Sequence, residues 1–249
     1  HCGRCGEVLV DQEETEALGH IEVIDPAVEA TSTEPGKTEG THCSRCGVIL
    51  KAQEAIPATG YHCGENVTWK LNGNVLTISG TGPMTHYNMR SRRWDGEYSK
   101  IEKVVISEGV TYIGAYAFFN CSYLTSVTIA DSVASIGNNA FQTCSMLETV
   151  SIPDRVQTIG AYAFNNCWCL TGVTIPKSVT SIGRNAFSRC YNLANIVVES
   201  GNTKYNSANN CNAIIESSTN TLIVGCRKTV IPNTVKVIGD NAFRDCYYL

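Results

Sequence analysis

The sequence lacks any long apolar run and carries little net charge. No stretch of about 18 apolar residues occurs in its 249 residues, so no transmembrane helix is expected. The formal net charge is −4, which creates no field that would attract nucleic acid or an anionic membrane surface. We therefore expect neither a nucleic-acid partner nor a membrane span.

The motifs of common enzyme classes are missing as well. The sequence contains no Gly-x-x-x-x-Gly-Lys-Ser/Thr, Gly-x-Ser-x-Gly or His-Glu-x-x-His pattern. These patterns bind phosphate, present a nucleophilic serine and hold a catalytic zinc ion, respectively. All five histidines precede residue 101. The chain is therefore predicted not to be an enzyme.

A 23-residue repeat dominates the second half of the chain. Its pattern, Ile-Gly-x-x-Ala-Phe-x-x-Cys-x-x-Leu, starts at Ile113, Ile136, Ile159 and Ile182, and returns at Ile238 after a longer interval. An alternating segment follows each Leu and suits a strand with one buried face. A single unit cannot bury its apolar side, whereas stacked units cover one another. The sequence therefore predicts a mostly β repeat solenoid with parallel strands and short helical or 3-10 turns.

These residues resemble the BspA-type leucine-rich repeats of bacterial surface proteins. The match covers residues 101–249, where Ile-Gly-x-x-Ala-Phe-x-x-Cys recurs five times. The resemblance implies a right-handed leucine-rich-repeat superhelix and an extracellular or cell-surface location. It also implies a role in adhesion and protein–protein contact.

Pattern and charge divide the chain into three expected segments. Residues 1–62 hold four basic and eleven acidic side chains, a net charge of −7, and contain short Cys/His repeats. Residues 63–100 contain two alternating segments around Asn72-Gly73-Asn74, which indicates a β-hairpin of the kind that caps a repeat array. Residues 101–249 hold the leucine-rich repeats, with an inserted hairpin predicted at about 199–230.

One column of the repeat is occupied by cysteine. Adjacent coils of such a stack lie about 4.8 Å apart, and parallel Cα–Cβ bonds keep the Cβ atoms beyond the roughly 3.8 Å of a disulfide. We therefore expect buried thiols that act as small apolar groups and as weak donors to turn backbone. The column is Cys121, Cys144, Cys167, Cys190 and Cys246.

A second repeat, 41 residues long, occupies the N-terminal segment. His1-Cys2-Gly3-Arg4-Cys5-Gly6 returns as His42-Cys43-Ser44-Arg45-Cys46-Gly47. Cys-x-x-Cys-Gly is typical of a zinc knuckle, and a segment with so few large apolar residues needs a staple. One hypothesis is a zinc site formed by Cys2, Cys5, Cys43 and Cys46, or by each pair with a histidine from among His20, His42 and His62. The alternative is that the two cysteine pairs are disulfides or free thiols.

This segment resembles the short Cys/His repeats found beside such solenoids in gut-type bacterial surface proteins. Those repeats usually carry a further Cys where this chain has Ser32, and Gly-His where it has Gly60-Tyr61. The resemblance therefore implies that the second copy has lost ligands. Zinc is the one cofactor that the sequence suggests.

The outward positions of the predicted strands are small and almost uncharged. They are Ser126, Thr128, Thr149, Ser151, Gly172, Thr174, Asn195 and Val197. The strand-lined face of a solenoid commonly binds, so we predict a flat, hydroxyl-rich surface for a protein or glycan ligand, with contacts from Ser126, Thr128, Thr149, Ser151, Thr174 and Asn195. Ser and Thr also favour solvated strands without any ligand. The alternative functions are a structural spacer and a targeting arm of a larger cell-surface enzyme.

Overall fold

The structure, a computed structural model, describes residues 3–6, 19–30, 35–56, 61–91, 93–244 and 246. It divides the chain into two units between residues 59 and 60, whereas the sequence pattern places the boundary between residues 62 and 63. Strand β6 (Tyr61–His62) accounts for the difference, because it pairs with β7 (Val67–Asn72) of the second unit.

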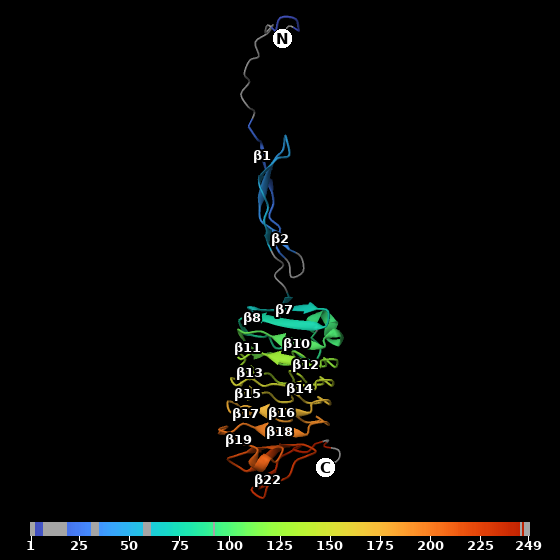
Figure 1. The fold of residues 1–249 in the computed structure, drawn as a ribbon, viewed down its shortest axis with the longest axis vertical. Coiled ribbons are helices and arrows are strands. Elements are labelled where there is room, and N and C mark those ends of the chain that lie inside the picture. The colour runs from blue at the N-terminus through green and yellow to red at the C-terminus, as the bar shows by residue number, and fades with distance from the viewer. Residues whose placement is uncertain are drawn as a thin grey trace. The chain divides into compact units, whose positions relative to one another are not determined.

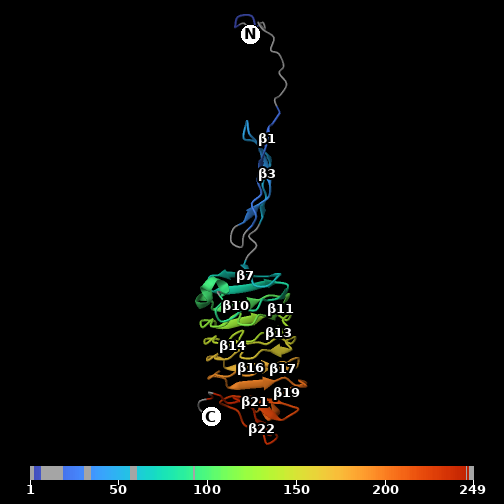
Figure 2. The same cartoon turned by 180° about the vertical axis from the view of Figure 1, so that it is seen from behind.

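Two of the three sheets described in the unit of residues 60–249 have strands that stack coil upon coil (Figures 1 and 2). Paired residues of the repeats are 23 positions apart, as in Ser126↔Thr149 and Ile113↔Ile136. The repeats therefore stack in register, which confirms the predicted β solenoid. The main sheet has the order β18 (Asn195–Val198), β16 (Gly172–Ile175), β14 (Thr149–Val150), β12 (Ser126–Ile129), β10 (Lys103–Ile106), β8 (Val75–Gly80), β7, β6. The second sheet has the order β17 (Ser181–Ile182), β15 (Thr158–Ile159), β13 (Ser135–Ile136), β11 (Val110–Ile113), β9 (Gly82–Pro83).

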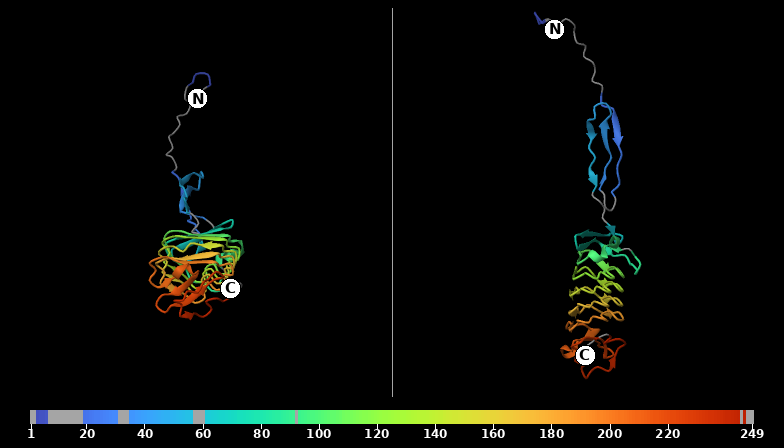
Figure 3. Two further views of the ribbon diagram at one scale, coloured as in Figure 1. Left: turned by 60° about the horizontal axis from the view of Figure 1, so that its bottom comes forward. Right: turned by 90° about the vertical axis from the view of Figure 1, so that its right-hand side faces the viewer.

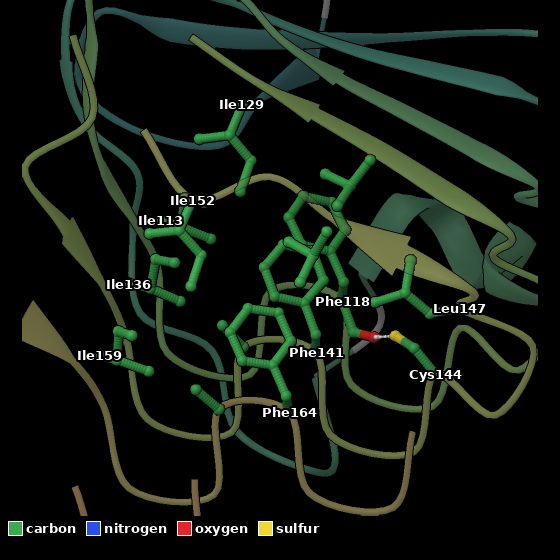
Figure 4. Close-up of a cluster of buried hydrophobic side chains, with 14 of the residues drawn as sticks. Ile113, Phe118, Ile129, Ile136, Phe141, Cys144, Leu147, Ile152, Ile159 and Phe164 are labelled. Atoms are coloured by element: carbon green, nitrogen blue, oxygen red, sulfur yellow. Dashed lines mark hydrogen bonds between the residues drawn. The ribbon is translucent and has the colours of Figure 1, made fainter. Parts of the chain in front are cut away.

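Stacked phenyl rings form the centre of the solenoid. The ring centroids of Phe118, Phe141, Phe164 and Phe187 follow one another at 5.0, 5.3 and 5.4 Å, and neighbouring rings lie within 15° of parallel. A file of buried isoleucines lies beside the rings (Figure 4). Both files occupy fixed columns of the repeat, so one continuous apolar interior runs through consecutive coils.

The segments that carry these rings are successions of single turns. Along residues 116–121, N–H groups donate alternately to a carbonyl group three residues earlier in the same coil and to a carbonyl group of the next coil. Tyr116 and Asn120 have φ angles of 57° and 62°, in the left-handed region that interrupts a helix. The equivalent residues of the following coils are left-handed as well. Hydrogen bonds between coils thus take the place of a continuous helical segment.

The glycine of each Ile-Gly pair lies against the backbone of the preceding coil. A Cβ atom on Gly160 would be 2.5 Å from the backbone nitrogen of Asn138, and one on Gly183 would be 2.2 Å from that of Ala161. Close-packed interiors do not tolerate such contacts. Packing between coils therefore explains why glycine recurs in this column.

The cysteine column also stabilises contacts between coils. Cys144, Cys167 and Cys190 are buried. Each Sγ donates to the carbonyl oxygen of the phenylalanine in the preceding coil, at 3.2, 3.3 and 3.2 Å, and Figure 4 shows the bond from Cys144 to Phe118. The prediction of buried thiols that donate to turn backbone is confirmed for these three.

A hairpin lies at the N-terminal end of the solenoid. β7 and β8 pair antiparallel, with Trp69 opposite Ile78, and β8 pairs parallel with β10. The hairpin therefore continues the main sheet beyond the repeats. The 3-10 helix η1 (Arg93–Lys100) follows it and places Trp94 on Phe118.

The residues after β18 form an additional small sheet. Its order is β19 (Tyr205–Asn206), β20 (Ala213–Glu216), β21 (Thr221–Gly225), β22 (Val237–Ile238), with the 3-10 helix η2 (Ala208–Asn210) between β19 and β20. β20 and β21 are an antiparallel hairpin. The side-chain amide of Asn202 fastens this segment to the preceding coil, because it donates to the carbonyl oxygens of Pro176 and Val179 at 2.9 and 3.0 Å.

The unit of residues 1–59 contains two small antiparallel sheets (Figure 3, blue). The first has the order β1 (Glu22–Asp25), β3 (Gly40–Cys43), β4 (Ile49–Lys51), and in the second β2 (Gly36–Lys37) pairs with β5 (Ala55–Ile56). Among the described residues of this unit, Cys43 is the one buried apolar side chain, and Ile24 and Ile49 are 61% and 70% exposed. These sheets are therefore not held by an apolar core.

Candidate binding face and candidate metal centre

The strand face is the outward side of the main sheet, formed by alternate residues of β12, β14, β16 and β18. Five of its six predicted contact residues are exposed, and Ser126 is half-buried. Ser126 and Thr149 are register partners, while Ser151 lies directly after β14. None of the four strands contains a charged residue. The face is therefore uncharged over four consecutive coils and mostly polar, with Gly172 and the 49% exposed Val197 as its non-polar positions.

Some hydroxyl groups of the solenoid bond to the backbone of another coil, whereas those described on the strand face do not. Among the described residues, none of the six contact side chains has a hydrogen-bond partner. In contrast, Thr125 Oγ1 donates to the Glu102 carbonyl oxygen at 3.0 Å, and Ser132 Oγ donates to that of Val110 at 2.8 Å. The strand face thus keeps its hydrogen-bonding capacity for groups outside the chain.

An apolar edge precedes these strands by three or four residues. It consists of Tyr123, Met146, Trp168 and Tyr191, of which the first three are 54%, 44% and 45% exposed. The Trp168 and Tyr191 rings have centroids 6.1 Å apart, and Trp168 Nε1 donates to Asn166 Oδ1 at 2.7 Å. Sequence reasoning missed this edge. Its signal is a large apolar residue near the cysteine column. This residue is the second after the cysteine at Tyr123 and Met146, and the first after it at Trp168 and Tyr191.

A second candidate site lies in the N-terminal unit. One potential ligand atom from each of His20, Cys43 and Cys46 lies within 4.8 Å of the others. Cys46 Sγ is 3.5 Å from His20 Nδ1. His20 and Cys46 are exposed, whereas Cys43 is buried. Two thiols and an imidazole are a donor set that suits zinc.

Strand pairing brings these three side chains together. β1 and β3 pair antiparallel with Glu22 opposite Cys43, and the Ser44 N–H donates to the Ile21 carbonyl oxygen at 3.0 Å. The β3–β4 turn then returns Cys46 beside Cys43, closed by the Gly47 N–H, which donates to the Cys43 carbonyl oxygen at 2.8 Å. Gly47 has a φ of 72°, which glycine adopts without strain.

The cluster differs in membership from the predicted four-cysteine site. It contains Cys43 and Cys46, both as free thiols, and it adds His20 from the first repeat copy. Cys5 is not a member, and Cys2 lies outside the described residues. His42 is not a member either, and its Nδ1 pairs with Asp25 Oδ1 at 3.0 Å. His62 lies in β6 of the other unit.

The Cys43 thiol is acidic in this environment. Hydrogen bonding from the Cys46 backbone N–H, from the His20 side chain and from the Arg45 backbone N–H lowers the pKa of Cys43 from 9.0 to about 6. A thiolate is the form that binds metal ions. The turn therefore favours the metal-binding form of one of its two cysteines near neutral pH.

Known proteins resemble the solenoid unit. The family model for the BspA type leucine rich repeat region matches six copies over residues 97–216 and 224–249. A leucine-rich repeat protein from Eubacterium ventriosum is similar with 29% identity and a TM-score of 0.59, over 73% of this chain and 56% of that one. A leucine rich cell surface protein from Faecalibacterium prausnitzii has 26% identity and a TM-score of 0.42, over 74% and 68% of the two chains. The chain thus spans little more than half of the E. ventriosum protein. No curated protein matches it.

Proposed function

The chain belongs to the BspA-type leucine-rich-repeat family, and from this premise we propose that residues 60–249 are a non-catalytic module that binds another protein through the strand face. Leucine-rich-repeat solenoids generally act through interaction, because stacked coils present a long continuous surface. We also propose that the module is displayed on a bacterial cell surface, as its family suggests. The described residues include no helix with the length and apolar character of a membrane span.

The observation that carries the proposal is the unused hydrogen-bonding capacity of the strand face. Hydroxyl groups stand in register on neighbouring coils at Ser126 and Thr149, and an amide follows at Asn195 beyond Gly172. These side chains have no hydrogen-bond partner among the described residues. Interfaces commonly form one hydrogen bond per 100–200 Å² of buried surface. A repeated row of free donors and acceptors suits such an interface.

The apolar edge supplies the second component of an interface. Binding energy concentrates in a few residues, and Trp and Tyr are enriched among them. Trp168 and Tyr191 lie next to one another on consecutive coils, and the Asn166 bond fixes the orientation of the Trp168 indole. The edge can therefore anchor a protein ligand whose polar groups reach the strand face.

An array experiment on the whole chain tests this function. The 249-residue protein is applied to immobilised extracellular-matrix and serum proteins and, separately, to a glycan array. We expect a hit on the protein array whose affinity falls by about tenfold or more in T128K/T174K, because lysines desolvate poorly in an interface core. The control Gln157→Lys adds one positive charge at an exposed position before β15 and should retain binding.

Three results would contradict the proposal. A protein ligand that binds T128K/T174K as tightly as the unmodified chain would place the contact elsewhere. Hits confined to the glycan array would replace the protein ligand by a sugar. Failure to bind either array at high micromolar concentration would favour a structural spacer or the targeting arm of a larger cell-surface enzyme.

A further inference from the structure

We propose that His20, Cys43 and Cys46 bind one Zn²⁺ ion that fastens the small sheet formed by β1, β3 and β4. The site joins the two copies of the 41-residue repeat, since His20 belongs to the first copy and both cysteines belong to the second. Its function would be structural, and it is independent of ligand binding by the solenoid.

The separation of the donor atoms in the structure fits tetrahedral zinc. Zn–N bonds of about 2.0–2.1 Å and Zn–S bonds of about 2.3 Å place N and S about 3.5 Å apart at the tetrahedral angle. His20 Nδ1 and Cys46 Sγ are 3.5 Å apart. The third donor, Cys43 Sγ, belongs to the group whose members all lie within 4.8 Å, so a small closure of the turn would complete the set.

The sheet needs a staple because it buries little apolar surface. Its described apolar side chains are largely exposed: Ile21 by 45%, Val23 by 38%, Ile24 by 61%, Val48 by 47%, Ile49 by 70% and Leu50 by 41%. Small units that cannot build a core are commonly held by a disulfide or a structural metal. Cys43 and Cys46 are not joined to each other, which leaves both thiols available to an ion.

The donor chemistry selects the ion. Thiolate and imidazole ligands favour zinc over the hard cations Ca²⁺ and Mg²⁺, which prefer oxygen. Three protein donors leave the fourth tetrahedral position to water, and the exposure of His20 and Cys46 gives solvent access to it.

In the second copy of the 41-residue repeat, a tyrosine stands where the first copy has His20. Tyr61 stands 41 residues after His20. It stacks on Trp69 of the solenoid cap, with ring centroids 4.4 Å apart and planes 15° from parallel. The same repeat position thus holds a zinc ligand when another Cys-x-x-Cys turn follows, and an aromatic contact when the solenoid follows.

Metal analysis of the reduced 249-residue chain tests the site. After incubation with zinc chloride and removal of unbound metal, we expect about one equivalent of zinc per chain. Cys43→Ser and Cys46→Ser should abolish stoichiometric binding, and His20→Ala should weaken it by at least about tenfold. His20→Cys should retain zinc, because a third thiolate replaces the imidazole. Cys169→Ser, which removes a free thiol outside the cluster, should bind zinc as the unmodified chain does.

Hydrogen exchange provides a readout that does not depend on counting metal. Zinc should slow exchange of the Ser44 and Gly47 amides by about tenfold or more, because both are bonded within the stapled turn, and it should leave the solenoid amides unchanged. Zinc below about 0.1 equivalent in the reduced protein would overturn the proposal. Binding that survives Cys43→Ser or Cys46→Ser, or a Cys43–Cys46 disulfide in the secreted protein, would overturn it as well.

Discussion

The indole ring of Trp94 stacks on the phenyl ring of Phe118, with centroids 5.4 Å apart and planes 13° from parallel. Trp94 Nε1 donates to the Ala117 carbonyl oxygen at 2.9 Å. On its other side Trp69 meets the indole edge-on, at 5.5 Å and 86°, and Tyr61 stacks on Trp69. The aromatic file of the repeats therefore continues into the N-terminal cap, which presents an indole where a preceding coil would present a phenyl ring.

Replacement of Trp94 by alanine should strongly destabilise the solenoid. The side chain is 1% exposed, so its removal opens a cavity over Phe118 and leaves the Ala117 carbonyl group without its donor. Substitutions of this kind cost about 3–5 kcal/mol. Urea unfolding followed by circular dichroism would measure the loss.

The matched control for Trp94 is Trp168→Ala, which removes the same side chain from a site that is 45% exposed. Its effect on the free energy of unfolding should stay within about 1 kcal/mol. Equal losses for the two variants would show that the aromatic file does not stabilise the cap.

Gly160→Ala should also destabilise the solenoid, through a clash between coils. The added Cβ would lie 2.5 Å from the Asn138 nitrogen and 2.6 Å from the Gly137 carbonyl carbon. Backbone cannot yield as a flexible side chain does, so the coils must separate, at a cost of about 1–3 kcal/mol. Thermal unfolding would measure it. Gly172→Ala is the control, because its Cβ would meet nothing nearer than the Asn195 oxygen at 3.3 Å. If Gly172→Ala lost as much stability as Gly160→Ala, the proposed clash would be excluded.

The parts of the fold that repeat were predictable, and so were the two single hairpins that turn residues mark, β7–β8 and β20–β21, whereas Trp94 was not. Fixed columns predict the phenylalanine file, the parallel strands and the thiol donors, because each coil must bury the same positions as its neighbour. Trp94 has no column to reveal it and lies in a segment without repeat character. The left-handed Tyr116 and Tyr162 were missed because tyrosine does not signal that conformation, as glycine or asparagine would.

The candidate sites show the same limit of sequence reasoning. The strand-face residues follow from the alternation of each strand, which fixes the outward positions. The membership of the metal cluster depends on which histidine lies near Cys43. The pairing of β1 with β3 decides this, because it places Glu22, two residues after His20, opposite Cys43. Sequence alone left His20, His42 and His62 as equal candidates, and the pairing selects His20.

Alkaline pH should weaken the solenoid through its buried thiols. Burial raises the pKa of Cys190 from 9.0 to about 12, with a smaller contribution from nearby Cys246. In the unfolded chain this thiol ionises near pH 9.0, whereas in the folded chain it stays neutral up to about pH 12. Unfolding therefore releases a proton at a pH between these two pKa values. The stabilising contribution is therefore complete below pH 9.0 and is lost as the pH rises toward 12.

The pH effect of Cys190 can be isolated with Cys190→Ala. Urea midpoints measured on either side of pH 9.0 should fall less steeply with pH in the variant, since alanine has no proton to release, although the variant begins with a lower stability. Tyrosines that ionise in the same range affect both proteins equally and cancel in the comparison. Identical slopes would show that the thiol is not protected from ionisation.

Asn202 should be required to hold the segment after β18 against the solenoid. Besides donating to the carbonyl oxygens of Pro176 and Val179, its Oδ1 accepts from the backbone N–H groups of Lys204 and Tyr205 at 2.9 and 2.8 Å. Asn202→Ala leaves four backbone groups without this partner, and each unsatisfied group in a buried site costs about 1–3 kcal/mol. Because solvent can reach some of these groups, we expect a total loss of about 2–4 kcal/mol and faster proteolysis between residues 199 and 230. The control Asn192→Ala, at an exposed position without a side-chain hydrogen bond, should change neither the stability nor the rate of proteolysis. If Asn202→Ala resisted the protease, other contacts would hold the segment in place.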